Sequence, residues 1–226
     1  GSYSFYRFQI IQTKNFEEQK GQIQKRFEET KMEALLAQMN PHFIFNAMNS
    51  IQNYIMDSDI DNATTFLDDF AKLIRLNLDH CTKPTILLVE EIEYLKSYMR
   101  IENTRFNNAI DVIFQIDPSI DQYDIEIPTM IIQSFVENVF VHAFPPGISD
   151  PTLKVDFRLI TDDVIQCRIE DNGIGYSSNP NNKLHKSKGV VLVKERLALL
   201  GYKEEEAIQV ISVKNKGTSI IITLTV

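Results

Sequence analysis

Apolar side chains recur at steps of three and four residues between positions 34 and 55, and this spacing predicts a helix with one buried face. The apolar positions are Ala34, Leu35, Met39, Phe43, Met48, Ile51 and Ile55. Pro41 interrupts the pattern, because proline lacks a backbone N–H and restricts the residue before it. We therefore expect the helix to kink or restart at Pro41 and to display His42 at the junction.

Helical patterns also occur on either side of this segment. Residues 16–37 form a short, imperfect heptad pattern, which predicts a helix that needs a partner helix. After residues 57–59, a second amphipathic helix is expected to start with Asp61 or Asn62 as its cap and to run to Leu78. One antiparallel helix pair buries little apolar surface, so two copies of the chain are expected to form a four-helix bundle.

The periodicity changes beyond residues 81–84, which we interpret as a linker. Strands are predicted at about 86–89, 110–116, 153–160, 163–170, 207–214 and 218–225, and helices at 90–106, from Pro128 and from about 189. Pro128 is expected to be the first residue of its helix. Helices mixed with mostly antiparallel hairpin strands predict an α+β fold, in which a helical hairpin precedes a two-layer α/β sandwich.

Composition narrows the possible functions. The net charge of -8 leaves no basic excess to bind nucleic acid or an anionic membrane. No apolar run reaches the roughly 18 to 20 residues that span a bilayer. Residues 3–11 are rich in aromatic side chains. This composition is typical of a segment that leaves a membrane interface, but it could equally be incidental. Cys81 and Cys167 have no zinc-ligand spacing, and a reducing compartment is expected.

A second group of candidate residues lies in the C-terminal half. Glu137, Asn138 and His142 share the helix after Pro128, and Asn138 and His142 are one turn apart. Glu170-Asp171-Asn172-Gly173-Ile174-Gly175 then follows a strand with a carboxylate and closely spaced glycines, which allow a sharp turn and a close approach to a ligand. Lys188-Gly189 precedes a helix whose N-terminus could receive phosphate, and Gly217-Thr218 begins the last strand.

In this order, the segments resemble the ATP-binding domain shared by sensor histidine kinases, gyrase-type topoisomerases, heat-shock chaperones and mismatch-repair ATPases. The upstream stretch QMNPHFIFN, residues 38–46, resembles the phosphoacceptor motif of histidine kinases of the LytS/YehU type. Residues 98–106 and 194–197 are similar to that family as well. The resemblance extends over nearly the whole chain from Lys31.

The resemblance implies roles for particular residues. His42 would be the phosphoacceptor, Asn138 would bind Mg²⁺, and Asp171 would bind the adenine amino group of ATP. Asn46 could orient water for dephosphorylating the partner or be a plain helix contact, and Glu137 is a substitute acid/base candidate. The remaining candidates for nucleotide binding are His142, Gly173, Gly175, Lys188, Gly189, Arg196, Gly217 and Thr218. The charged ones could equally be surface groups, and Arg196 could be part of a structural ion pair.

The chain also departs from the family pattern. Ser134 stands where hydrolytic relatives carry a general-base glutamate, which disfavours a water-attacking ATPase. Phe43 follows His42 where many histidine kinases have a carboxylate. One glycine, Gly189, occupies a box that often has two, and Val141 replaces a common lysine. These last two features support the alternative of a dimeric pseudokinase scaffold that binds nucleotide without phosphotransfer.

The resulting hypothesis is the cytosolic part of a two-component sensor histidine kinase of the cytoplasmic membrane. It would act as a homodimer, use ATP and Mg²⁺, and pass its phosphoryl group to a response regulator without contacting nucleic acid. Residues 3–40 would form a juxtamembrane coiled-coil helix, residues 41–83 the rest of the phosphotransfer hairpin, and residues 84–226 the ATP-binding domain.

Overall fold

The structure is a computed structural model that describes residues 41–176 and 188–226. Internal contacts divide the chain into two units, residues 1–45 and 46–226, and helix α2 (Pro41–Met56) runs from the first into the second. The helix predicted over residues 16–37, the kink before His42 and most of the loop after Tyr176 lie outside the described residues. Among the residues that the structure covers, no helix is both long and apolar enough to cross a membrane.

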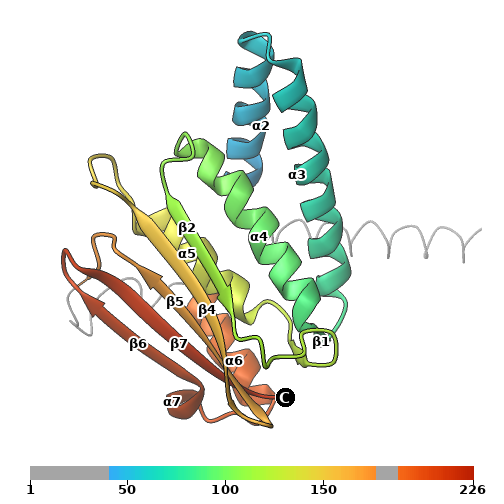
Figure 1. The fold of residues 1–226 in the computed structure, drawn as a ribbon, viewed down its shortest axis with the longest axis vertical. Helices are drawn as coiled ribbons and strands as arrows, with labels where there is room; N and C mark the ends of the chain where they lie inside the picture. Colours follow the sequence, from blue (N-terminus) through green and yellow to red (C-terminus); the bar gives the residue numbers. More distant parts are fainter. Residues whose placement is uncertain (1–40, 177–187) are drawn as a thin grey trace, which may run out of the picture. The chain divides into compact units, whose positions relative to one another are not determined.

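Helices α2 and α3 (Ile60–Cys81) form an antiparallel hairpin (Figure 1). The cap of α3 is Asp59, so the prediction of Asp61 or Asn62 was wrong by at least two residues. A carboxylate oxygen of Asp59 accepts the backbone N–H of Asn62 at 3.3 Å, and its other oxygen accepts the Asn62 amide at 2.7 Å. Asn62 therefore lies in the first turn, where it donates to the cap instead of being the cap.

The rest of the chain alternates helices and strands much as predicted. The elements are β1 (Thr85–Leu87), α4 (Leu88–Arg105), β2 (Asp111–Ile116), β3 (Glu126–Pro128), α5 (Ile131–His142), β4 (Thr152–Thr161), β5 (Val164–Asp171), α6 (Lys188–Leu199), α7 (Glu204–Ala207), β6 (Ile208–Val213) and β7 (Gly217–Thr225). The short elements β3 and α7 were not predicted. Each spans only a turn or a few residues, too little to produce a periodic signal.

Pro128 does not start a helix, contrary to the sequence prediction. It ends β3, which pairs antiparallel with β1 in the register Thr85 to Pro128. Proline disfavours the helical region for the residue before it, which suits Ile127 to the strand. Helix α5 begins three residues after Pro128, following Met130 in a left-handed conformation with φ of 63°.

The main sheet has the strand order β2-β4-β5-β7-β6. Only β2 and β4 are parallel, and the other pairs are antiparallel, which confirms the predicted α+β class and mostly antiparallel sheet. Helices α4, α5 and α6 form one layer on one face of this sheet (Figure 1). Alternate residues of β4 and β5, such as Val155, Phe157 and Cys167, are buried beneath that layer.

Helix α3 packs along α4, on the far side of the predicted linker. Asn77 donates its side-chain amide to the Tyr94 hydroxyl at 3.2 Å, and Arg100 forms an ion pair with Asp69 at 2.9 Å. His80 is buried and its ring lies 5.9 Å from the ring of Tyr94. Extensive contacts therefore cross the predicted boundary between residues 83 and 84.

Candidate functional site

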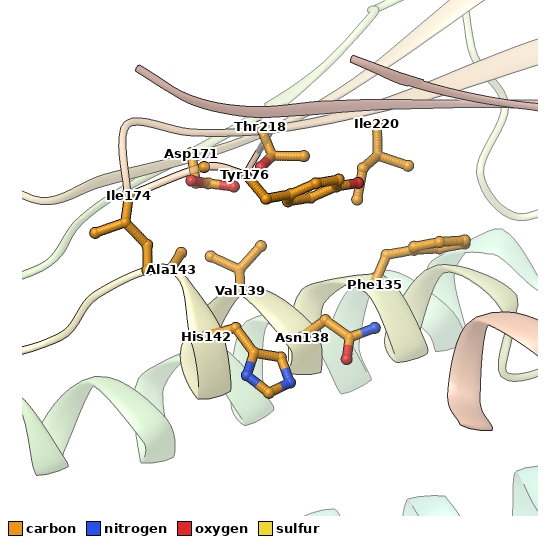
Figure 2. Close-up of a pocket in the computed structure, with 11 residues that line it drawn as sticks. Phe135, Asn138, Val139, His142, Ala143, Asp171, Ile174, Tyr176, Thr218 and Ile220 are labelled. Carbon is orange, nitrogen blue, oxygen red and sulfur yellow. The ribbon is translucent and has the colours of Figure 1, made fainter. Parts of the chain in front are cut away.

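Helix α5 supplies one wall of a pocket (Figure 2). Asn138 and His142 lie one turn apart and line the pocket, and Phe135 and Val139, whose side chains extend toward the strands in Figure 2, add apolar surface. The opposite side of the helix is buried, because Ile132, Val136 and Phe140 are at most 2% exposed. The apolar spacing of the helix thus fixes which side carries the two polar groups.

The turn after β5 supplies the facing wall. Asp171 ends the strand, and its carboxylate accepts the backbone N–H of Gly173 at 2.9 Å. Burial raises the pKa of Asp171, while the backbone N–H groups of Gly173 and Thr218 oppose that rise. A half-buried carboxylate of this kind is suited to accept a hydrogen bond from a ligand amino group.

The two glycines of this turn are required by close approaches of the backbone. A Cβ on Gly173 would lie 2.3 Å from the Ala143 carbonyl oxygen, and one on Gly175 would lie 2.2 Å from that of Val213. Ile174 donates its backbone N–H to the Ala143 carbonyl at 3.0 Å, which ties the turn to the end of α5. The turn therefore holds Asp171 against α5 at a fixed distance.

Gly217 and Thr218 close the pocket from β7. Gly217 has φ of 95°, and a Cβ there would lie 1.9 Å from the Asp171 carbonyl oxygen. Thr218 pairs with Asp171 across the strands and shares a hydrogen bond of 2.9 Å with the Ser212 hydroxyl. The Ser212 hydroxyl also accepts the backbone N–H of Tyr176 at 2.9 Å. The Ser212 hydroxyl thus joins the turn after β5 to the start of β7.

The pocket therefore brings together Asn138, His142, Asp171, Gly175 and Thr218, all of them predicted from the sequence. Gly173 and Gly217 shape it from behind. The sequence reasoning missed the apolar lining and Tyr176, whose ring lies between β7 and α5 (Figure 2). Because Tyr176 directly follows Gly175, the sequence pattern could have included it among the candidate site residues. The sequence indicated only that the other lining residues belong to the apolar core, namely Phe135, Val139, Ala143, Ile174 and Ile220.

Several predicted site residues lie elsewhere. Glu137 does not line the pocket; its carboxylate accepts the Gln133 side-chain amide at 2.7 Å on another side of α5. Arg196 donates to the hydroxyl of the buried Thr129. Lys188 and Gly189 begin α6, but their side-chain surroundings lie outside the described residues.

The two predicted residues of the phosphoacceptor motif both belong to α2. His42 is its second residue, and the surroundings of the His42 side chain are not among those described. Asn46 lies one turn later and is half-buried.

Buried acids gather where α4 meets α5. Glu91 is 1% exposed, and burial raises its pKa to about 7. Burial also raises the pKa values of Glu102 and Glu137, and the charge of Glu102 raises the pKa of Glu137 further; beside burial, the charges of both acids raise the pKa of Tyr98. Arg105 opposes the rise at Glu102, with which it forms an ion pair of 3.0 Å. The α4–α5 contact is therefore sensitive to the charge of its acids.

Comparison with known proteins assigns the family. Residues 30–110 match the family model described as histidine kinase. Sensor protein LytS of Bacillus subtilis is 30% identical over 205 residues, which cover 87% of this chain and 34% of that protein. LytS of Staphylococcus epidermidis is 32% identical over 158 residues, covering 70% of this chain and 26% of that protein. The chain belongs to the LytS-type sensor histidine kinases.

This LytS-type chain spans about a third or less of the length of these relatives. The matched range 30–110 includes His42, Asn46 and all of α4, and it ends before α5. Among solved structures, the histidine kinase domain of the Erythrobacter litoralis EL346 blue-light activated histidine kinase has a TM-score of 0.49 and 15% identity, over 82% of this chain and 95% of that chain.

Proposed function

We propose that this chain is the signalling part of a two-component sensor histidine kinase, which transfers the γ-phosphoryl group of ATP to His42 and then to an aspartate of a response regulator. The observation that carries the proposal is the pocket between α5 and β7, where Asn138, Asp171 and Thr218 converge. The sequence QMNPHFIFN, which begins α2 at its proline, supplies the matching acceptor.

The donor groups of the pocket fit a magnesium nucleotide. Asp171 would accept the adenine amino group, and the apolar side chains Val139 and Ile220 would cover the ring faces. The amide oxygen of Asn138 is a ligand type that Mg²⁺ accepts together with water and phosphate oxygens. Within residues 41–176 and 188–226, no group of three His, Cys, Asp or Glu side chains could hold a metal ion alone. Mg²⁺ would therefore arrive with the nucleotide and neutralise phosphate charge.

The enclosed part of the pocket measures only about 50 Å³, far less than a nucleotide base needs. The ring of Tyr176 lies between β7 and α5 and takes up part of this space (Figure 2). We therefore expect the Tyr176 side chain to turn aside when ATP enters, while its backbone stays bound to Ser212.

Phosphoryl transfer would need positioning more than acid or base catalysis. The unprotonated nitrogen of a neutral His42 ring would form the N–P bond as the bond from phosphorus to the ADP oxygen breaks, and the imidazolium would then release its proton to solvent. No carboxylate follows His42, because Phe43 occupies that position. Asn46, one turn later, would act in the reverse direction by orienting water for dephosphorylation of the partner.

A homodimer and attachment to the cytoplasmic membrane belong to the same proposal. Helices α2 and α3 expose a set of apolar side chains that a second copy would cover, namely Met48, Ile55, Met56, Ile60 and Leu67, each at least 50% exposed. The membrane anchor and the sensing region would lie in the part of the full-length protein that precedes this chain.

Incubation with γ-labelled ATP and Mg²⁺ tests the proposal. Acid-labile, alkali-stable label on the wild-type chain is expected, with none on His42→Ala and little on Asn138→Ala. His142→Ala, which keeps both the acceptor and Asn138, should retain part of the labelling and serves as the graded control. Transfer of the label to a response regulator is the second step.

Other results would point to other functions. Nucleotide binding without labelled protein would favour the pseudokinase scaffold, and free phosphate without labelled protein would favour a hydrolytic ATPase. Equal labelling of wild type and His42→Ala would exclude His42 as the acceptor. Ser134, whose hydroxyl donates to the Met130 carbonyl at 3.1 Å, is not a general base and already weighs against the ATPase.

A further inference from the structure

The last turn of α5 is held by a side chain from α4. Arg105 donates from Nη2 to the Phe140 carbonyl at 2.8 Å. Helix α5 ends at His142, so the Phe140 carbonyl belongs to the final group of carbonyls that have no partner within a helix. A cation at this end also complements the negative end of the helix dipole.

Arg105 is itself held in place. The same Nη2 atom lies 3.0 Å from a carboxylate oxygen of Glu102, whose side chain is 4% exposed. The guanidinium lies over the Phe106 ring at 4.8 Å from its centroid, and that ring lies 6.2 Å from the ring of Phe140. The guanidinium therefore has a fixed geometry that a flexible ammonium would not reproduce.

Acidic and basic groups of α4 face opposite ends of α5. The carboxyl of Glu91 faces the backbone N–H of Gln133 in the first turn of α5, although neither oxygen of Glu91 makes a hydrogen bond of normal geometry among the described residues. Arg105 meets the last turn of α5. The two helices therefore run in the same general direction, with α4 presenting an acid to the positive end and a base to the negative end of α5.

Phe140 lies between the two polar residues of α5 that line the pocket. Asn138 precedes it by two residues and His142 follows it by two, and both line the pocket, whereas Phe140 is buried. The end of the helix is tied on the pocket side by the Ile174 N–H on the Ala143 carbonyl. Arg105 supplies the restraint on the opposite side.

We propose that Arg105 is a positioning residue for the nucleotide site, acting through the Phe140 carbonyl to fix the last turn of α5 and with it Asn138 and His142. The inference rests on the proposed nucleotide function. Arg105 touches neither nucleotide nor His42; it sets where the Mg²⁺-binding amide lies relative to Asp171. Since α4 also packs against α3, Arg105 is one point at which a movement of α4 would reach the end of α5 that lines the pocket.

The test compares Arg105→Gln, Arg105→Lys and Arg158→Gln in the full chain. Arg158 is the matched control, because it is also ion-paired, to Asp156 at 2.6 Å, but belongs to the solvent side of β4. Affinity for a non-hydrolysable ATP analogue with Mg²⁺ is measured well below the melting temperature, where circular dichroism shows each variant to be folded. Amide exchange of residues 139–143 is the second readout.

Arg105→Gln should weaken nucleotide binding about tenfold, the effect of losing most of one charged hydrogen bond, and should speed exchange in residues 139–143. Arg105→Lys should recover only part of the affinity. Arg158→Gln should lower the melting temperature without changing either readout. If Arg105→Gln does not fold, Glu102→Gln, which leaves the guanidinium without its buried partner, should weaken binding about threefold.

Wild-type affinity in a folded Arg105→Gln chain, or in Glu102→Gln where that variant replaces it, would overturn the positioning role and leave the proposed function intact. Full rescue by lysine would also overturn it, because a point charge would then suffice. A wild-type chain that binds no nucleotide would instead refute the proposed function, and the positioning role with it.

Discussion

Replacing Glu91 with glutamine removes a titrating group that the fold buries completely. Glu91 is 1% exposed and both its carboxylate oxygens lack a normal hydrogen bond among the described residues. Glutamine has nearly the same shape and no charge, so the substitution tests the cost of the charge and little else. We expect Glu91→Gln to stabilise the protein at alkaline pH and to have little effect at pH 4.5.

The magnitude follows from the pKa of Glu91. The ordinary value is 4.5 and the value in the folded chain is about 7, mainly because of burial and further because of the charge on Glu137. A difference of about 2.5 corresponds to roughly 3.4 kcal/mol, at about 1.36 kcal/mol for each pKa unit. A raised carboxyl pKa means that the folded state binds the proton more tightly, so this stability is complete below pH 4.5 and is lost as the pH rises through 7.

The measurement is urea denaturation of wild type and Glu91→Gln at pH 4.5, 6, 7 and 8 at one protein concentration. The difference in unfolding free energy should grow from near zero at pH 4.5 to about 3 kcal/mol at pH 8, slightly below the full value because a small part of the loss has already occurred at pH 4.5. Glu93→Gln is the matched control on the same helix, since the Glu93 side chain is 56% exposed and its carboxylate lies 4.0 Å from the Lys72 ammonium. Parallel curves for wild type and Glu91→Gln across this range would refute the reasoning.

Two further predictions concern other parts of the fold. Gly217→Ala should cost several kcal/mol of stability and abolish nucleotide binding, because its Cβ would lie 1.9 Å from the Asp171 carbonyl oxygen. Gly201 has a similar φ of 87° but open space around it, so Gly201→Ala should cost only about 1 kcal/mol. Equal losses of stability in the two variants would contradict the clash. Burial lowers the pKa of His80, so the wild-type chain should lose stability as the pH falls below 6.5. His80→Phe should keep the ring contact with Tyr94 and lose this part of the pH dependence. If denaturation curves of the two proteins show the same loss of stability in acid, His80 is not its source.

The sequence predicted the elements whose periodicity is long and missed those defined by pairing. The strands β4, β5 and β7 alternate over eight residues or more, and their predicted bounds differ from the observed ones by one residue at most ends. The three-residue strand β3 exists because β1 pairs with it across about forty residues of sequence, and no local pattern announces such a partner. The helix cap at Asp59 was missed for a similar reason, since several acidic and amide side chains compete within five residues.

The candidate site shows the same contrast between residues that a local pattern predicts and residues whose role depends on tertiary contacts. Asn138, Asp171 and the glycine positions were predicted because their residue types and order are specific. The roles of Glu91 and Arg105 could not be predicted, because a glutamate and an arginine on an amphipathic helix look like surface groups until the burial of one and the Phe140 carbonyl at the other are known. The role of Arg196 could not be predicted either, because it donates a hydrogen bond to Thr129 and does not line the pocket.

The hydrogen bond between Thr129 and Lys83 has a consequence for how this protein can be divided into fragments. Thr129, which directly follows β3, donates its hydroxyl to the Lys83 carbonyl at 2.9 Å and accepts from Arg196, so the connection after α3 is joined through Thr129 to α6. A fragment that begins at Pro84 keeps β1 paired with β3, but it loses α3 and the Lys83 carbonyl that accepts the Thr129 hydroxyl. Because α3 also contacts α4, a piece that begins before α3, at the exposed turn around Ser58, keeps more of its native contacts than one that begins at Pro84.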